Sequence, residues 1–240
     1  MKAVILAGGL GVRLKPFTQV IPKPLLPIGE KSVLEIQIGR LKQFGFTDIF
    51  LATNYKSDYI ERFFGDGSEF GVDLTVSREA EPLGTAGPLK LLEEHLDTPF
   101  VVMNGDILSL LDFGKLYDFA AGQDSLLTLT IKKEIMPFDF GNIFFDGELV
   151  TGIEEKPDIV MYILAGIYVM KPEIFRFFPE NEFFGMDMLI KRMLAEKERV
   201  SKYELTDYWL DIGRIDDYYT AQKEYNQHFN AGEQASGSER

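Results

Sequence analysis

Short apolar runs alternate with helically spaced apolar positions along the first half of the chain. Residues Lys2–Leu6 form a continuous, partly β-branched apolar run before a glycine break, which is typical of a buried strand. Similar runs predict strands at 49–53, 72–76 and 100–103. Apolar spacing predicts helices at 33–44, 57–64, 85–96 and 113–121. This alternation predicts a doubly wound, mostly parallel α/β sheet flanked by helices, whose ligands bind at the carboxyl ends of the strands.

The pattern changes in the second half of the chain. Asp146 and Gly147 separate two strand-like runs, and this dipeptide is typical of a tight hairpin turn. We therefore expect an antiparallel element that joins the sheet and makes it mixed. A further strand is predicted at 165–170, and helices at 186–196 and 215–228. We expect one domain at 1–229, followed by a disordered polar tail at 230–240.

The chain is acidic overall but basic at its beginning. Its formal net charge is -13 over 240 residues, yet residues 1–42 contain seven lysines and arginines against two acidic residues. The acidic remainder argues against a nucleic-acid-binding protein, whereas a local basic pocket suits a small polyanion. No apolar run is long enough to span a membrane, and Met1 leads directly into a strand without a signal-peptide pattern. We therefore expect a cytoplasmic protein with no membrane partner.

The basic residues gather in the stretch LAGGLGVRLKPFTQVIPKPLLP, which begins at the end of the first strand. Gly8, Gly9 and Gly11 can bring backbone N–H groups close to a phosphate, and Arg13 and Lys23 add positive charge. The loop is neither a Walker A sequence nor a dinucleotide-binding fingerprint. A flexible turn is the alternative for the glycines alone, but the two cations favour phosphate binding.

This stretch closely resembles the signature of the sugar-1-phosphate nucleotidyltransferases. The resemblance continues in the same order through EPLGTAGPLKL, MNGD, EEKP, AGIYVM and WLDIG, so it covers nearly the whole chain. It implies a Rossmann-like nucleotidyltransferase fold. It also implies the reaction of a nucleoside triphosphate with a sugar 1-phosphate to give a nucleotide sugar and pyrophosphate. The motif EPLGTAGPL is similar in particular to mannose-1-phosphate guanylyltransferases.

The resemblance implies a role for each matching position. Arg13 contacts the triphosphate and stabilises the departing pyrophosphate, with Lys23 assisting, and Lys156 of EEKP holds the incoming sugar phosphate. Such a transfer needs positioning and charge neutralisation more than a strong base, because the attacking phosphate oxygen is already anionic. The implied nucleotide-binding positions are Leu6, Ala7, Gly8, Gly9, Gly11, Glu79, Gly84 and Thr85.

Asp106 and Asp211 occupy the positions that this family uses for Mg²⁺. Mg²⁺ commonly takes one or two carboxylates together with phosphate oxygens. Taken singly, an Asn-Gly turn at Asp106 and a helix N-cap at Asp211 are the alternatives, but together with the glycine loop they favour a metal site. The chain has no cysteine and only two histidines, His95 and His228, so we expect neither a thiolate nor a histidine-rich metal site.

Glu79 stands where the family's uridylyl and thymidylyl enzymes commonly have glutamine. Guanine presents N1–H and N2–H₂ donors, which suit a carboxylate that only accepts hydrogen bonds. GTP is therefore the favoured substrate, with the backbone of Gly84 close to the base. The exocyclic amine of cytosine could also donate to Glu79, and a solvated glutamate before a proline turn is the structural alternative.

The residues expected at the sugar phosphate are Gly141, Glu155, Lys156 and Leu164. The family usually has a polar residue before AGIYV, and Leu164 cannot make the hydrogen bond that such a residue gives to a sugar hydroxyl. Either the sugar is deoxygenated or differently oriented there, or a register shift brings in another side chain. Phenylalanines at 138–145 and 175–184 are expected mainly as packing, with a sugar cover or a subunit interface as the alternative.

These observations support three hypotheses. The first is a Mg²⁺-dependent sugar-1-phosphate guanylyltransferase, and the second is a cytidylyltransferase acting on a sugar or polyol phosphate. The third is a non-catalytic regulator that binds nucleotide sugars on the same fold. The joint presence of Arg13, Asp106, Lys156 and Asp211 favours catalysis. A homo-oligomer is compatible with the sequence, and no hexapeptide-repeat domain is expected after Tyr225.

Overall fold

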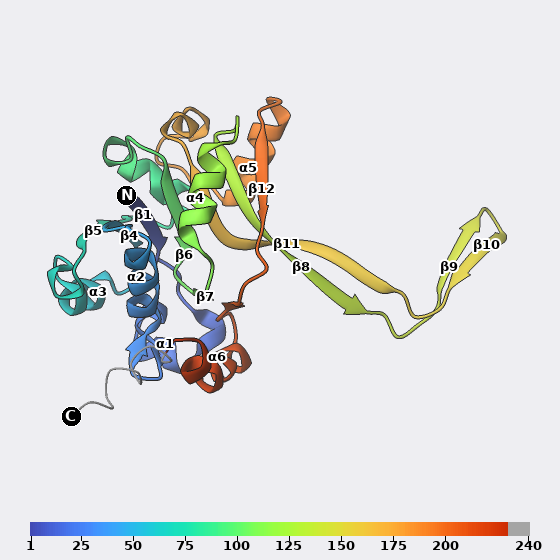
Figure 1. Ribbon diagram of the computed structural model, residues 1–240, viewed down its shortest axis with the longest axis horizontal. Coiled ribbons are helices and arrows are strands. Elements are labelled where there is room, and N and C mark those ends of the chain that lie inside the picture. Colours follow the sequence, from blue (N-terminus) through green and yellow to red (C-terminus); the bar gives the residue numbers. More distant parts are fainter. Residues whose placement is uncertain (230–240) are drawn as a thin grey trace.

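The computed structural model describes residues 1–229 of the chain, and the expected tail at 230–240 lies outside the described residues. Seven strands form the central sheet (Figure 1), in the order β12 (Val200–Glu204), β8 (Leu127–Pro137), β11 (Asp158–Met170), β6 (Phe100–Asn104), β1 (Lys2–Leu6), β4 (Asp48–Thr53) and β5 (Asp73–Arg78). All run in the same direction except β11, which is antiparallel to both neighbours. The predicted mixed, mostly parallel sheet is confirmed.

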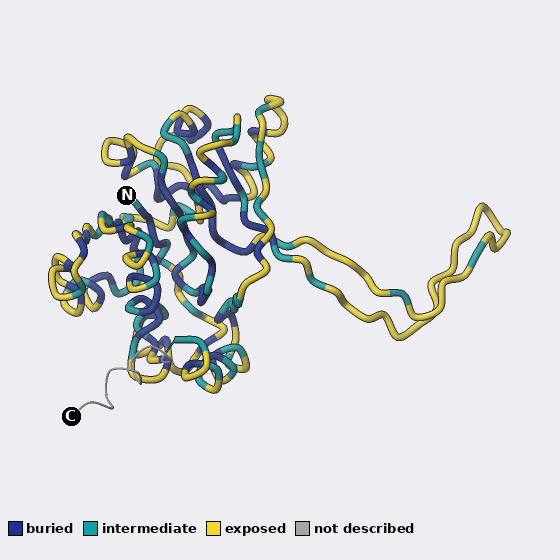
Figure 2. The backbone as a smooth tube through the Cα atoms, in the orientation of Figure 1, coloured by how far each residue is buried: buried dark blue, intermediate teal, exposed yellow. Residues whose placement is uncertain are grey.

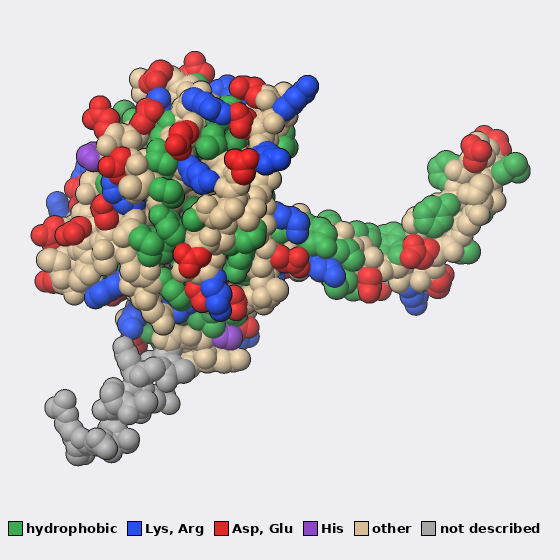
Figure 3. Space-filling model, turned by 45° about the horizontal axis from the view of Figure 1, so that its top comes forward, with side chains coloured by type: hydrophobic (Ala, Val, Ile, Leu, Met, Phe, Trp, Pro, Cys, Tyr) green, Lys and Arg blue, Asp and Glu red, His purple; other side chains and the backbone are tan. Residues whose placement is uncertain are grey.

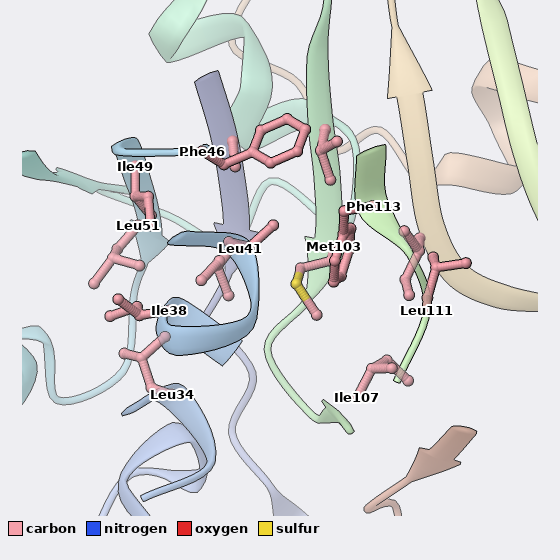
Figure 4. Close-up of a cluster of buried hydrophobic side chains, with 14 of the residues drawn as sticks. Leu34, Ile38, Leu41, Phe46, Ile49, Leu51, Met103, Ile107, Leu111 and Phe113 are labelled. Atoms are coloured by element: carbon pink, nitrogen blue, oxygen red, sulfur yellow. The ribbon is translucent and has the colours of Figure 1, made fainter. Parts of the chain in front are cut away.

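Alternate side chains of the strands pack on opposite faces of the sheet. On β1, Ala3 and Ile5 belong to the core on one face and Val4 to the core on the other. Figure 4 shows part of the first core. The helices packed there are α2 (Val33–Gln43), α3 (Ser57–Phe64) and α4 (Phe113–Ala121). The helices on the second core are α5 (Met186–Ala195), η4 (Gly87–His95) and η5 (Pro172–Phe177).

Helix α2 begins at a capping box. The Ser32 hydroxyl accepts a hydrogen bond from the Glu35 backbone N–H (3.2 Å), and the Glu35 carboxylate accepts one from the Ser32 N–H (2.6 Å). These bonds satisfy two donors that have no partner within the helix. The helix then buries Leu34, Ile38 and Leu41 against the sheet, which is the spacing that predicted it.

Smaller elements form a third core next to the loops that follow β1 and β6. They include two short sheets, β2 (Pro27–Ile28) with β3 (Lys31–Ser32) and β7 (Ile107–Ser109) with β13 (Trp209–Asp211). Helix α6 (Ile215–His228) adds Tyr218, Ala221 and Tyr225 to this core. The remaining short helices of the described chain are η1 (Val12–Leu14), α1 (Phe17–Val20), η2 (Lys23–Leu25) and η3 (Ser68–Phe70).

A two-stranded arm, residues 132–163, projects away from the rest of the described chain, which we call the body (Figure 1). Its inner part is the continued pairing of β8 with β11, which extends to Pro137 and Asp158. Its outer part is a hairpin of β9 (Asn142–Asp146) and β10 (Leu149–Glu154). Figure 2 shows that the arm is exposed along most of its length.

The arm differs from two expectations. The hairpin at Asp146 and Gly147 is confirmed, but it forms a two-stranded sheet of its own and does not join the central one. It lies beyond the part of β8 and β11 that pairs with β12 and β6. The expected helix at 85–96 is the 3-10 helix η4. Within the described residues, no helix is both long enough and apolar enough to cross a membrane.

The phenylalanines divide between the arm and the body. The expectation of packing is confirmed for Phe175, Phe177, Phe178 and Phe184, which are buried in the second core. It is wrong for the first cluster, whose four rings are 38–73% exposed because no second layer covers the arm; these are Phe138, Phe140, Phe144 and Phe145. Phe183 is 63% exposed at the edge of a pocket.

Candidate functional site

The glycine loop follows the carboxyl end of β1. Gly11 has φ +58°, a left-handed conformation that favours glycine, and an added Cβ would lie 2.6 Å from the Thr18 side chain. The buried Thr18 hydroxyl donates a hydrogen bond to the Gly11 carbonyl (2.8 Å), which fixes the turn. The loop lines a pocket of about 170 Å³ whose lining includes Leu6, Ala7, Gly9, Gly11, Arg13, Lys23 and Asp106.

Two cations and two carboxylates meet at this pocket. An added Cβ at Gly213 would lie 3.2 Å from Arg13 Nη2 and 3.6 Å from Asp211 Oδ1, so both groups lie against this glycine. Lys23 forms an ion pair with Asp106, and the two side chains are 11% and 25% exposed. The structure therefore brings together the four residues that the sequence predicts for the triphosphate and the metal.

The two carboxylates have the properties of metal ligands. Burial raises the pKa of Asp211, and the neighbouring Asp106 charge raises it further, against the opposing effect of Lys23 and Arg13. Oδ1 of each carboxylate is buried and has no hydrogen-bond partner among the described residues. A divalent cation fits this pair because it would bind both oxygens that otherwise have no described partner.

The described residues contain no group of three or more His, Cys, Asp or Glu side chains that could hold a metal ion. Mg²⁺ does not need such a group, because it commonly takes one or two carboxylates and completes its shell with phosphate oxygens and water. Asp106 and Asp211 are thus enough for an ion that arrives with a nucleotide.

A buried glutamine holds the turn that includes Asp106. Gln37 of α2 donates from Nε2 to the carbonyls of Asn104 (2.9 Å) and Ile107 (2.8 Å), on either side of the aspartate. The Asp106 carbonyl in turn accepts a hydrogen bond from the Ile212 N–H (2.9 Å). The pairing of β7 with β13 and these bonds fix the spacing of the two carboxylates.

A second pocket, of about 480 Å³, shares Leu6, Gly9 and Asp106 with the first. Besides Leu6 and Gly9, its lining includes four more predicted nucleotide-binding residues, namely Gly8, Glu79, Gly84 and Thr85. Gly84 has φ +86°, and an added Cβ would lie 2.7 Å from the Phe184 carbonyl oxygen. The Thr85 hydroxyl accepts a hydrogen bond from the Met186 N–H (2.8 Å) at the start of α5. This pocket is therefore enclosed partly by backbone.

Glu79 faces the glycine loop across the second pocket. Its Oε2 accepts a hydrogen bond from the Leu83 N–H (2.8 Å), and its Oε1 would lie 2.8 Å from a Cβ added at Gly8. Burial raises the pKa of Glu79, and the bond from Leu83 opposes this rise. One oxygen is thus fixed by the backbone, and the other lies close to Gly8 of the glycine loop in the lining of this pocket.

The residues predicted for the sugar phosphate lie apart from both pockets. Gly141 and Glu155 are neighbours on the arm, since an added Cβ at Gly141 would lie 3.2 Å from Glu155 Oε2. Lys156 follows with φ +47°. Leu164 pairs with Ile131 where the arm leaves the sheet, and it is 42% exposed. Among the described residues that line the two pockets, none belongs to the arm.

The family model described as nucleotidyl transferase matches residues 2–228. The chain belongs to this family. Among relatives of this chain are the mannose-1-phosphate guanyltransferases of Saccharomyces cerevisiae (35% identical) and Candida albicans (36% identical), each matched over 91% of the chain. The chain spans 63% and 62% of the length of these two relatives.

A solved structure also resembles this chain. HddC from Yersinia pseudotuberculosis complexed with GMP-PN has a TM-score of 0.71 and 29% identity, with 93% of this chain and 99% of that chain covered. The likeness extends over nearly the whole chain, so it agrees with the predicted fold.

Two further residues of the chain support the candidate site, although they are not predicted from the sequence. Gln37 holds the turn that includes Asp106. The feature of the sequence that could have revealed it is a polar residue on the apolar face of a predicted helix. Trp209 donates from Nε1 to the Ala165 carbonyl (2.7 Å), and Lys132 Nζ lies 4.9 Å from the centre of its ring. This tryptophan joins β13, which ends at Asp211, to the base of the arm.

Proposed function

We propose that this nucleotidyl transferase is a Mg²⁺-dependent guanylyltransferase that joins GTP to a sugar 1-phosphate and releases pyrophosphate. The observation that supports it most is the meeting of Arg13, Lys23, Asp106 and Asp211 around one glycine loop. Relatives named mannose-1-phosphate guanyltransferase and a similar structure that holds GMP-PN favour GTP. The presence of GTP in the cytoplasm makes that compartment the natural location for such an enzyme.

The transfer proceeds by attack of a sugar-phosphate oxygen on the α-phosphorus of GTP. A new P–O bond forms as the bond to the β-phosphate oxygen breaks, and pyrophosphate leaves with that electron pair. The nucleophile is already an anion, so no side chain has to remove a proton. Arg13 and Lys23 offset the charge that grows on the pyrophosphate, and one preorganised group of this kind contributes about 3 kcal/mol in a transition state.

Asp106 and Asp211 would hold Mg²⁺ through the two carboxylate oxygens that have no other described partner. When bound, the ion offsets negative charge on the triphosphate. Lys23 forms an ion pair with Asp106 and so holds a positive charge beside this carboxylate. Gln37 keeps the turn in place by its two hydrogen bonds.

Glu79 would recognise guanine. Its Oε1 can accept hydrogen bonds from the N1–H and N2–H₂ groups, while Leu83 holds Oε2. Donors on the base would also offset the cost of burying this carboxylate, because hydrogen bonds to the charged form favour ionisation.

The sugar phosphate would bind to the arm. Lys156 supplies a positive charge for the phosphate, and Glu155 beside Gly141 can accept hydrogen bonds from sugar hydroxyls. Leu164 offers only an apolar contact, which favours a sugar without a hydroxyl at that point.

The direct test is pyrophosphate release from a panel of nucleoside triphosphates and sugar 1-phosphates with Mg²⁺. Turnover with GTP supports the proposal, turnover with CTP would favour a cytidylyltransferase, and binding without turnover would favour a regulator.

Glu79→Gln tests the base preference in the same assay. We expect GTP turnover to fall at least about tenfold relative to UTP, because the amide presents a donor where guanine also presents donors. Glu81→Gln, two residues away in the same loop, is the matched control. An unchanged preference for GTP in Glu79→Gln would assign base recognition to another residue.

A further inference from the structure

The arm exposes large apolar side chains on both faces. Paired residues of a two-stranded ladder share a face, so Ile135 and Val160 lie on one face and Met136 and Ile159 on the other. All four are 42–52% exposed. Figure 3 shows apolar side chains along the arm outside the body.

The outer hairpin is more exposed still. Phe140, Phe145 and Leu149 are each 70–74% exposed. A two-stranded ribbon is at best marginally stable by itself in water, and a large exposed apolar surface usually marks a contact site. The arm therefore needs another protein surface to cover it.

The arm also keeps one half of the proposed site away from the other. Pairing continues along the arm from Leu164 to Asp158. At about 3.3 Å per residue, this places Lys156 roughly 20 Å or more from Leu164 at the arm's base. In this structure the arm points away from its own body (Figure 1). Each chain thus presents a nucleotide half in the body and a sugar-phosphate half on the arm, without joining them.

The body has a complementary apolar surface beside the nucleotide half. Leu10, Val12 and Val20 are 56–67% exposed in and after the glycine loop. Nearby, Phe17 of α1 and Tyr218 of α6 line a groove of about 420 Å³ whose walls are mainly apolar. A ribbon lying here would cover apolar surface on both partners and would end next to the pocket that includes Arg13.

We propose that the protein is a homodimer in which the arm of each protomer lies across the glycine loop and α1 of its partner, so that Lys156 of one chain completes the site of the other. A second copy is the occupant because each chain supplies both complementary surfaces and both halves of the site. Two-fold symmetry lets a single association cover both arms and complete both sites. The role of Lys156 rests on the proposed function, whereas the exchange of arms does not.

Complementation between two inactive variants tests the exchange. Arg13→Ala damages the body half and Lys156→Ala the arm half, and each homodimer is expected to lose at least about 100-fold in turnover. The two chains are co-expressed with different tags, and the mixed dimer is isolated by two affinity steps. If arms are exchanged, the mixed dimer has one intact site and recovers about half of the wild-type activity. If each arm serves its own body, both sites stay damaged and no activity returns, which overturns the proposal.

Cross-linking tests the exchange without any need for turnover. The chain has no cysteine, so Phe145→Cys places a single thiol on the arm for a photoreactive maleimide. Mixing ¹⁴N- and ¹⁵N-labelled protein during refolding distinguishes links within a chain from links between chains. We expect links between chains to peptides that contain Leu10 to Ile21. Links confined to one chain, or to another part of the partner, contradict the exchange even if the enzyme is active.

Sedimentation equilibrium measures the association itself. The wild-type protein, whose chain has a mass of 27.3 kDa, is expected to sediment with twice that mass. The double variant Phe140→Asp/Leu149→Asp is expected to sediment with the mass of one chain and to keep the wild-type circular dichroism spectrum. Leu194→Asp, on α5 and 57% exposed, is the control that should remain a dimer. A wild-type monomer overturns the proposal. Absence of turnover in a cross-linked dimer would instead count against the proposed function alone.

Discussion

Arg13 is the residue on which the proposed transfer depends most. Its guanidinium lies against Gly213 beside Asp211, where it can reach a phosphate bound at the glycine loop. Arg13→Ala should lower kcat at least about 100-fold, because the loss of one charge-stabilising group commonly has this effect. The melting temperature should hardly change, since the residue is exposed. Lys15→Ala, at an exposed neighbouring position, should keep near-normal turnover in the same assay, and a similar loss there would argue for a general electrostatic effect.

Replacing Asp211 by asparagine is predicted to raise the melting temperature of the metal-free protein and to abolish turnover. Its pKa is raised in the folded protein, so ionisation of this carboxyl destabilises the fold. The free energy of unfolding is lowered by the full amount at pH values above the pKa of Asp211 in the folded protein. It is not lowered at pH values below the pKa of an unfolded aspartate, which is about 4. Without divalent metal, Asp211→Asn should therefore melt higher than wild type at pH 7, and the difference should vanish as the pH falls through that range.

Two further measurements separate the metal role of Asp211 from a general effect of charge. Asp211→Asn should lose turnover and any stabilisation by Mg²⁺. Asp106→Asn should instead melt lower than wild type, because it leaves the largely buried Lys23 without its partner. A lower melting temperature for Asp211→Asn at pH 7 would show that the carboxylate has a stabilising partner.

Most residues of the nucleotide half could be predicted because short motifs specify them. Gly11 requires a left-handed backbone, and Arg13 and Asp106 are charged residues next to glycine turns, so each leaves a local signal. Gln37 leaves almost none, because its role depends on two carbonyls about 70 positions away. The alternatives of an Asn-Gly turn at Asp106 and a helix N-cap at Asp211 are also local patterns, so the sequence alone does not reveal that one oxygen of each carboxylate is buried without a described partner.

At the scale of elements, the contact between α2 and the turn after β6 is the feature that positions Asp106 in the proposed metal site. Gln37→Leu keeps a side chain of similar size but removes both hydrogen bonds to that turn. Two buried carbonyls then lose a donor, and we expect a loss of about 1–3 kcal/mol in the free energy of unfolding. The Mg²⁺ concentration for half-maximal rate should also rise several-fold, because Asp106 is no longer held in place.

The control for this variant is Gln43→Leu, at an exposed position of the same helix. It should change neither the denaturation midpoint nor the Mg²⁺ dependence. If Gln37→Leu is destabilised but its Mg²⁺ dependence is normal, the glutamine supports the fold alone and does not position Asp106.

The elements of the first half could be predicted closely, since each is a local pattern. Helices α3 and α4 have the predicted bounds. The second half was harder because strand partners there are distant in sequence: β12 pairs with β8 about 70 residues earlier. The arm shows most clearly where prediction from local sequence patterns fails. Its strands alternate little between apolar and polar residues, which is typical of a strand covered on both faces, and the covering surface does not belong to any neighbouring segment of the chain.

At the scale of the whole molecule, the residues proposed for the nucleotide belong to the body, whereas Gly141, Glu155 and Lys156, which are proposed for the sugar phosphate, belong to the arm. Selection of base and sugar could therefore change independently, because Glu79 and Lys156 lie on parts of the chain that share no pocket. Exposed apolar surface is concentrated largely on the arm and in the region around α1.

This separation predicts how ligands affect thermal stability. A nucleotide that binds only the folded body stabilises it by about 2.7 kcal/mol at 100 times its Kd, which is roughly 5–10 °C in melting temperature for a chain of this size. GTP with Mg²⁺ should therefore raise the melting temperature of wild type and of Lys156→Ala equally in differential scanning fluorimetry. Arg13→Ala should show a smaller rise, because it loses a phosphate contact. A rise that disappears in Lys156→Ala would mean that the arm holds the nucleotide, and the division of substrates between body and arm would then be wrong.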